Sequence, residues 1–211
     1  MSDEISYARV KSQVIEAEAY SRRNQRRHQH EMTMIANAMK MTDNVKTVLD
    51  APCGVGRASI WFAQQGLDVT AIDLGQAALA LAAQLAAKAD VQIRFESQDL
   101  FSLPYKARAY DATLCFRLLH HFESPALRSR LIGEICRVSK RYVLISRMTP
   151  ISITSIRRRL RYLLTGKPIK QYPVSAGELT AEMRQHGFEP VGHTGGMALL
   201  SSLQLQMYSR K

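Results

Sequence analysis

The chain has 211 residues, of which 46% are hydrophobic and 22% charged, a composition typical of a folded globular protein. This length is sufficient for one domain with its own hydrophobic core. Lysine and arginine outnumber aspartate and glutamate by 29 to 18, giving a formal charge of +11. Such a charge favours anionic partners, namely phosphorylated substrates, acidic lipid surfaces or nucleic acid, although a basic surface that only aids solubility would look the same.

The sequence predicts a cytoplasmic protein. No apolar run approaches the length of a membrane span, and the first residues are acidic, unlike those of a signal peptide. The cysteines at positions 53, 115 and 136 form an odd set without the spacing of a metal site. We therefore expect reduced thiols.

Residues 1–45 precede the first predicted strand. Residues 5–20 have apolar side chains at helical spacing, and residues 21–30 are strongly basic. A second helix is predicted from Met32, Ile35, Ala36 and Met39, which share one face.

The most informative stretch follows a short apolar run, residues 47–49, that ends at Asp50. Pro52, Gly54 and Gly56 come next, and a helical pattern begins at Ala58. This is the order of a strand, a tight turn and a helix. Glycines allow the turn and let a ligand lie against bare main chain, and the amides that open the helix point toward that ligand.

A second apolar run, residues 69–72, ends at Asp73, which lies nineteen residues after Gly54. An acidic residue in this position is placed to accept hydrogen bonds from the two hydroxyl groups of a ribose. Together, the glycine-rich turn and this acidic residue predict an adenosine-type nucleotide site on a doubly wound sheet.

Two residues distinguish between the possible nucleotides. The dinucleotide fingerprint requires a third glycine where this chain has Ser59. Asp50 would repel a pyrophosphate but favour the ammonium group of a methionine-like tail. S-adenosylmethionine (SAM) is therefore a better fit than NAD.

At these positions the chain resembles the class I SAM-dependent methyltransferases, whose first motif is D-x-G-x-G-x-G. Asp50, Gly54 and Gly56 match this motif, whereas Pro52 replaces its first glycine and stiffens the turn. The resemblance implies an α/β fold with a doubly wound, seven-stranded, mostly parallel sheet of order 3-2-1-4-5-7-6. It also implies an N-terminal helical lid (residues 1–45), a SAM-binding core (46–147), a substrate-cover insertion (148–172) and a C-terminal helix and hairpin (173–211).

The resemblance also implies the cofactor-binding residues. They are Asp50, Pro52, Cys53, Gly54, Gly56, Arg57, Asp73, Leu74, Asp99, Leu100, Phe116 and Arg117, with Arg23 from the N-terminal region. Arg23, or alternatively Tyr20, would meet the SAM carboxylate, because a guanidinium group matches its planar geometry. A solvated junction between two helices would explain this basic segment equally well.

The middle of the chain continues the alternation of helices and strands. A helix is predicted over residues 76–88 and a strand over residues 91–95, before Asp99 and Leu100. The resemblance implies that Asp99 accepts the adenine amino group and that the Leu100 backbone meets a ring nitrogen. Alternatively, Asp99 only caps a turn.

A further strand is predicted over residues 110–116, and its carboxyl end carries residues 117–122, Arg-Leu-Leu-His-His-Phe. Because ligands of open parallel sheets lie beyond the carboxyl ends of strands, this stretch should face the reactive methyl group. It resembles the post-strand motif of small-molecule methyltransferases. A helix over residues 125–138 and a strand over residues 142–146 follow.

Methyl transfer needs the acceptor aligned with the methyl group, and oxygen or nitrogen acceptors can also need a base. His121 is our first candidate for that base and His120 the second, because the pKa of histidine lies near working pH. A purely structural, hydrogen-bonded histidine is an equal alternative, and His193 is a weaker candidate. We expect no metal, since adjacent histidines should point to different faces of a helix.

Residues 157–164, Arg-Arg-Arg-Leu-Arg-Tyr-Leu-Leu, permit two interpretations. They could bind an anionic substrate group or an acidic bilayer into which the leucines dip. We favour an amphipathic helix that packs its leucines on the domain and turns a basic face outward. Ser175 and Glu178 then predict the start of a helix ending before Gly187, and residues 188–193 and 198–208 predict a hairpin.

We therefore predict a SAM-dependent methyltransferase that acts on a small, anionic or lipid-linked acceptor, with O-methylation favoured. Peripheral contact with an acidic membrane, at the inner membrane face, is compatible with this. RNA methylation is an alternative, but nucleic acid is less favoured. The loop after the strand at residues 110–116 lacks the N/D/S-P-P-Y/F tetrad of base methylases, and no Pro-Cys pair follows that strand. The aromatic residues also do not interleave with the basic clusters. A second alternative is a SAM-binding partner protein that does not catalyse.

Overall fold

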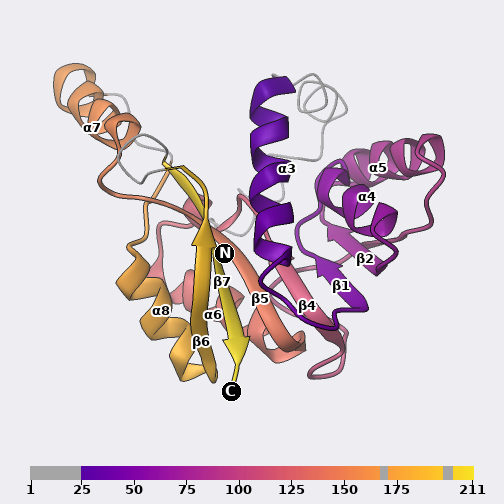
Figure 1. The fold of residues 1–211 in the computed structure, drawn as a ribbon. Helices are drawn as coiled ribbons and strands as arrows, with labels where there is room; N and C mark the ends of the chain where they lie inside the picture. Colours follow the sequence, from indigo (N-terminus) through magenta and orange to yellow (C-terminus); the bar gives the residue numbers. More distant parts are fainter. Residues whose placement is uncertain (1–24, 167–170, 197–201) are drawn as a thin grey trace.

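In a computed structural model of the chain, residues 25–166, 171–196 and 202–211 are described. Within these ranges, seven strands form one sheet with the order β3-β2-β1-β4-β5-β7-β6 (Figure 1). The strands are β1 (Thr47–Asp50), β2 (Asp68–Asp73), β3 (Arg94–Ser97), β4 (Tyr110–Cys115), β5 (Ser139–Met148), β6 (Phe188–Thr194) and β7 (Leu203–Arg210). The first five pair in parallel, and β7 runs antiparallel to both β5 and β6. The predicted fold class and strand order are confirmed.

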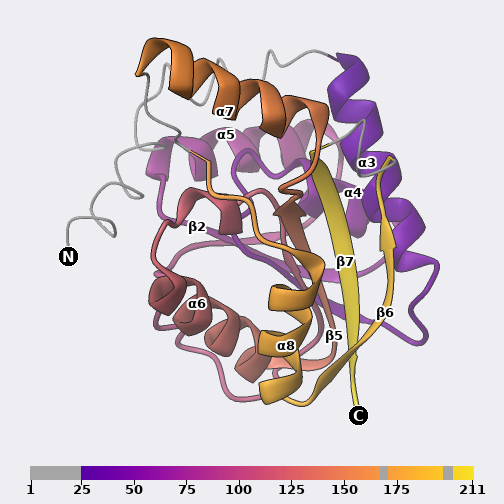
Figure 2. The same cartoon turned by 90° about the vertical axis from the view of Figure 1, so that its left-hand side faces the viewer.

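Helices cover both faces of the sheet, as the two perpendicular views show (Figures 1 and 2). They are α3 (Gln25–Met39), α4 (Arg57–Gln64), α5 (Gln76–Lys88), α6 (Pro125–Val138), α7 (Ile153–Thr165) and α8 (Ala176–Gln185), with a short 3-10 helix, η1 (Leu119–His121). Among the described residues, no helix is both long and apolar enough to cross a bilayer.

Alternation along β5 explains how one sheet supports two cores. Val143 and Ile145 belong to the cluster that also contains buried residues of α6 and α8. Tyr142 and Leu144, which point to the opposite face, belong to the cluster that contains buried residues of α3 and α4. A strand that is buried on both faces has a continuous run of apolar residues, as residues 142–145 do.

Several predicted boundaries shift in the structure, each for a local reason. The strand expected over residues 91–95 is β3, at Arg94–Ser97, because the Val91 amide donates to the Ala86 carbonyl and stays with the end of α5. β5 is longer than the predicted 142–146, because β7 pairs with it as far as Met148. The helix expected over residues 5–20 lies outside the described residues, as do residues 198–201 of the strand expected over residues 198–208.

The described part of the expected N-terminal lid, α3, is built into the core. Met34, Ile35 and Ala38 are buried against the sheet, and the Thr194 hydroxyl donates to the Met34 carbonyl at 2.8 Å. Only the first turns of α3 extend toward the carboxyl ends of the strands (Figure 1).

The favoured interpretation of residues 157–164 is wrong. These residues do form a helix, α7, but it projects from the body of the protein instead of packing its leucines on it (Figures 1 and 2). Leu163 and Leu164 are each 78% exposed. The connection from β5 carries α7 beyond the end of the sheet, where no strand or helix of the described chain covers its leucines.

Candidate cofactor and acceptor site

The glycine-rich turn adopts backbone conformations that require glycine. Gly54 and Gly56 have φ values of 56° and 74°, in the left-handed region that side chains disfavour. A Cβ atom on Gly56 would lie 3.0 Å from the Cβ atom of Ala82 and 3.4 Å from the Phe95 ring. The missing side chain at Gly56 therefore makes room for α5 and β3 of the protein itself.

Asp73 joins the two turns that the sequence singled out. Its carboxylate accepts a hydrogen bond from the Gly54 amide at 2.8 Å and another from the Gly75 amide at 2.9 Å. The side chain is buried, with 1% of the residue exposed. Because each carboxylate oxygen can accept two hydrogen bonds, Asp73 can fix both turns and still accept from a ligand.

Asp50 lies on the neighbouring strand at the same edge of the sheet. It pairs in register with Ala71, two residues before Asp73. The Ser59 hydroxyl donates to the Asp50 carboxylate at 2.5 Å, and both residues are buried. Sequence reasoning treated Ser59 only as a missing glycine. Ser59 follows Asp50 by nine residues within one strand–turn–helix unit, and this spacing could have identified it as a partner of Asp50.

Asp99 and Leu100 follow β3 at the third strand end. Asp99 is exposed, and its Oδ1 atom accepts from the Phe101 amide at 2.9 Å, so it does form the turn that was one of the two alternatives. A carboxylate has a second oxygen that can still accept from a ligand. Leu100 is buried, which fixes the backbone beside it.

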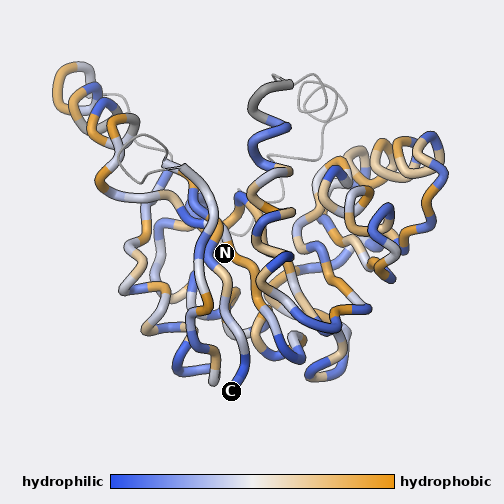
Figure 3. Tube along the Cα trace, in the orientation of Figure 1, coloured by the Kyte–Doolittle hydropathy of each residue, from blue (hydrophilic) through white to orange (hydrophobic). Residues whose placement is uncertain are grey.

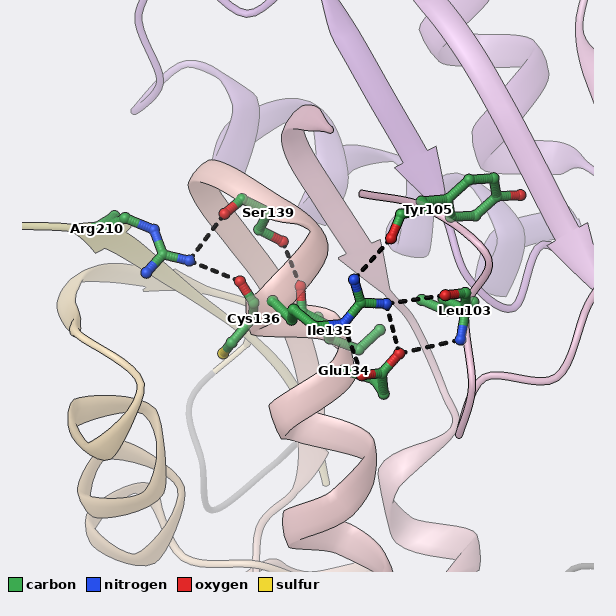
Figure 4. Close-up of polar contacts among 8 residues, drawn as sticks. Leu103, Tyr105, Glu134, Ile135, Cys136, Ser139 and Arg210 are labelled. Carbon is green, nitrogen blue, oxygen red and sulfur yellow. Dashed lines mark hydrogen bonds and ion pairs between the residues drawn. The ribbon is translucent and has the colours of Figure 1, made fainter. Parts of the chain in front are cut away.

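Arg137 and Glu134 of α6 hold the loop between β3 and β4. Arg137 donates to the Tyr105 carbonyl at 2.6 Å and to the Leu103 carbonyl at 2.9 Å, while Glu134 accepts from the Leu103 amide at 3.0 Å. Figure 4 shows Glu134 beside Leu103, with the Arg210 contacts to Cys136 and Ser139 at the other side of α6. The hydrogen bonds from Arg137, and after them the Leu103 amide, hold the pKa of Glu134 below its usual value. This network gives the loop after Asp99 a fixed course.

The loop after β4 is held from two directions. Arg117 has a φ of 62°, and its amide donates to the Ser146 hydroxyl at 2.5 Å. Its guanidinium forms an ion pair with Glu31 of α3, a carboxylate that is buried. Sequence reasoning missed Glu31, although it is the single acidic residue within α3. Arg117 thus positions α3 over the carboxyl end of β4, next to Phe116.

The same turn of α3 brings His28 near Arg57, the first residue of α4. Burial lowers the pKa of His28, and the positive charge of Arg57 lowers it further, whereas Glu31 acts in the opposite direction. The neutral form of His28 is thus favoured, and Arg57 supplies the positive charge where α3 meets the start of α4. Arg23, the residue expected to bind a carboxylate there, lies outside the described residues.

His120 and His121 lie in η1, directly after the Arg117 loop. His120 is buried and His121 is exposed. Their ring centroids are 4.3 Å apart, so the expectation that adjacent histidines point to different faces is wrong for this 3-10 turn. The His120 carbonyl accepts from the Tyr172 amide at 2.8 Å, which ties η1 to the segment that follows α7. His193 is exposed on the edge strand β6, two strands beyond β5.

The remaining predicted residues lie where the turns place them. Pro52 is buried within the first turn, Cys53 is half-buried, and the Cys53 amide donates to the Ile72 carbonyl at 2.7 Å. Leu74 lies between Asp73 and Gly75, whose amide donates to the Asp73 carboxylate. Cys53, Cys115 and Cys136 form no disulfide with one another. Among the described residues, no three histidine, cysteine or acidic side chains gather as a metal site.

Comparison with known proteins agrees with this arrangement. Residues 48–141 match the family model described as a methyltransferase domain. This part of the chain is a methyltransferase domain. The family prediction is confirmed, and the matched residues run from β1 into the start of β5, so they include all four strand ends of the candidate site.

Among curated relatives, a ubiquinone biosynthesis O-methyltransferase of Bordetella avium is 29% identical over 157 residues, which cover 71% of this chain and 65% of the relative. The chain thus spans slightly less than two thirds of that relative's length. Among solved structures, magnesium protoporphyrin IX methyltransferase from Synechocystis with bound SAM superposes with a TM-score of 0.73 at 19% identity, covering 99% of this chain and 97% of that one. A [4+2]-cyclase, SpnF, superposes with a TM-score of 0.69 at 18% identity, covering 86% and 81%. These structural likenesses establish the fold.

Proposed function

We propose that the protein transfers the methyl group of SAM to the oxygen of a small or lipid-linked acceptor. The observation that carries this proposal is the row of carboxylates, Asp50, Asp73 and Asp99, at the carboxyl ends of three adjacent strands. The ammonium, ribose hydroxyl and adenine amino groups of SAM are all hydrogen-bond donors, and carboxylates are acceptors. A row of acidic side chains suits this cofactor and opposes a pyrophosphate.

The residues present fit SAM. Asp50 would face the ammonium end, Asp73 the ribose, and Asp99 with the Leu100 backbone the adenine. The methionine carboxylate would lie toward the positive charge of Arg57, where α3 meets the start of α4. When bound, SAM supplies an electrophilic methyl group on a positively charged sulfur.

His121 would receive the proton of the acceptor hydroxyl. It is exposed, so an acceptor can reach it, and it follows the end of β4, the strand next to β1. His120 is buried beside it, and its main chain is held by Tyr172, so it is suited to orient the imidazole of His121. We assign His121 as the base and His120 as its positioning residue.

The acceptor class rests on the relatives and on charge. The relatives found in Bordetella and Coxiella are named ubiquinone biosynthesis O-methyltransferases, and the Synechocystis structure is a porphyrin methyltransferase. A formal charge of +11 favours an acceptor that is anionic or embedded in an anionic surface. The same charge keeps RNA methylation as the second candidate. The cyclase superposition shows that this fold also supports other reactions, so the reaction has to be measured.

Calorimetric titration with SAM and with S-adenosylhomocysteine tests the cofactor. We expect micromolar binding of both ligands and none of NAD. Incubation of the protein with methyl-labelled SAM and separate lipid, small-molecule and RNA fractions tests the acceptor. Label in the lipid fraction supports the proposal, whereas label in RNA with strongly salt-dependent RNA affinity supports the second candidate. Binding of SAM without transfer to any fraction would indicate a non-catalytic SAM-binding protein.

A further inference from the structure

Helix α7 carries an apolar stripe that no part of the described protein covers. Five residues at helical spacing share one face, and each is at least 45% exposed: Ile153, Ile156, Leu160, Leu163 and Leu164. The alternation of hydrophobic and hydrophilic residues along this helix is visible in Figure 3. Leucine and isoleucine in water forgo the free energy that burial would give, so this stripe is suited to contact a surface beyond the described residues.

The charge around the stripe has one sign. Between Met148 and Gly177 the sequence contains six arginines and lysines and no aspartate or glutamate. Arg157 and Arg161 are exposed and lie on the helix at one border of the stripe. An apolar stripe bordered by arginine is the pattern of a helix that lies in the interface of an anionic bilayer.

The chain is anchored to the body of the protein at the start of α7 and again at residues 172–174. At the first end, the Ser155 hydroxyl donates to the Thr149 carbonyl at 2.8 Å, and Ser152 caps the helix. After the helix, the Val174 amide returns to the Met148 carbonyl at 3.1 Å and the Tyr172 amide to the His120 carbonyl. The helix therefore projects from the end of the sheet that carries η1, so a surface that binds α7 would lie on the side of His121.

We propose that α7 docks the protein on an anionic membrane surface, with the apolar stripe among the outer acyl chains and the arginines at the lipid phosphates. RNA would use the arginines but would leave the stripe in water. A second copy of this chain would bring like-charged helices together. The proposal deepens the proposed function, since a lipid-linked acceptor would then reach His121 from the bilayer, but docking itself does not depend on SAM.

Vesicle flotation with the full chain tests the docking. We expect binding to vesicles of equimolar phosphatidylcholine and phosphatidylglycerol, and at least about tenfold weaker binding to phosphatidylcholine alone. The triple variant Leu160→Ser/Leu163→Ser/Leu164→Ser should lose at least about tenfold in affinity for the anionic vesicles. The control Val191→Ser removes an apolar side chain that is 45% exposed on the edge strand β6, and should bind as the unmodified protein does.

Two double charge-reversal variants distinguish the effect of the α7 arginines from the effect of the protein's net charge. Arg157→Glu/Arg161→Glu should abolish most binding, whereas Lys88→Glu/Lys106→Glu, which changes the net charge equally at exposed positions away from α7, should reduce it by no more than about threefold. Calorimetric SAM affinity should stay the same in all four variants. A protein that docks but does not bind SAM would refute the proposed function and leave docking standing.

Three results would overturn the docking proposal. One is equal binding to neutral and anionic vesicles. Another is triple-variant binding that matches the unmodified protein. The third is sedimentation analysis in which the stripe variant converts a dimer into a monomer while vesicle binding does not change, because the stripe would then be covered by a second copy of the chain.

Discussion

Two connections in this protein follow the carboxyl ends of parallel strands, but one buries its apolar residues and the other exposes them. The loop after β3 buries Leu100, Phe101 and Leu103 in the core, and Arg137 fixes its main chain. The connection after β5 instead projects as α7, with Leu163 and Leu164 in solvent. In the function proposed above, the first connection belongs to the half of the site that would bind the cofactor, and the second borders the half that would meet the acceptor. The contrast is between a half held by internal hydrogen bonds and a half whose apolar helix face we propose is covered by a membrane.

The largest expected effect concerns the acceptor half. His121→Ala should lower kcat by about 10²- to 10⁴-fold if His121 is the general base, because the acceptor hydroxyl would lose its proton acceptor. SAM affinity should change less than twofold. The measurement is the rate of label transfer to the acceptor fraction, together with calorimetry. His193→Ala, an exposed histidine on β6, is the matched control and should leave both values unchanged.

In the cofactor half of the site, we expect a substitution to change the affinity for SAM. Asp73→Asn removes a charge that accepts from the Gly54 and Gly75 amides, and places an amide group where only acceptors are needed. We expect SAM affinity to fall by about 30- to 100-fold, corresponding to about 2–3 kcal/mol. Asp68→Asn, at the exposed start of the same strand, should bind SAM normally. Equal affinity in the two variants would show that Asp73 does not organise the nucleotide site.

A third prediction asks whether the loop after β3 is as firmly held as its contacts indicate. Arg137→Ala should lower the free energy of unfolding in urea by about 1–3 kcal/mol, since it leaves the Leu103 and Tyr105 carbonyls without this donor. Proteolysis should then cut the loop between Asp99 and Tyr110. Arg184→Ala removes an exposed ion pair to Glu189 and should cost less than about 1 kcal/mol. A similar loss in both variants would mean that the loop does not depend on Arg137.

The smallest expected effect is a dependence on pH. Hydrogen bonds from Arg137 keep the pKa of Glu134 below its usual value in the folded protein. A depressed carboxyl pKa stabilises the fold above the unfolded pKa of about 4.3, and this stabilisation is lost as pH falls through the folded value. Glu134→Gln should therefore lower the melting temperature at pH 7, and the difference from the unmodified protein should shrink as the pH falls below about 4.3. A difference that stays constant as the pH falls would exclude this charge as the cause.

The resemblance to a known family implied the strand order, which no local pattern determines. The two acid-terminated strand ends could be predicted from the residues themselves because they depend on local sequence. Asp50, Gly54, Gly56 and Asp73 lie within one strand–turn–helix–strand unit, and short-range patterns determine such units. One miss is a contact across the fold, since Glu31 meets Arg117 from 86 residues away. The other is local, because the motif led us to look for a glycine at position 59, where the Ser59 hydroxyl donates to Asp50 instead. For α7 the helical period was correct, but amphipathicity alone does not tell which surface covers the apolar face.

The double role of Asp73 limits how the cofactor preference of this domain could be redesigned. One carboxylate anchors both turns, so a substitution chosen to admit a ribose-modified analogue would also release the backbone at Gly54 and Gly75. Selecting variants of Asp73 that accept SAM analogues altered at the sugar would thus also destabilise the fold. Asp99 is the independent position, because its described side-chain bond is confined to its own turn. If it meets the adenine as proposed, libraries directed at Asp99 should retain far more active clones.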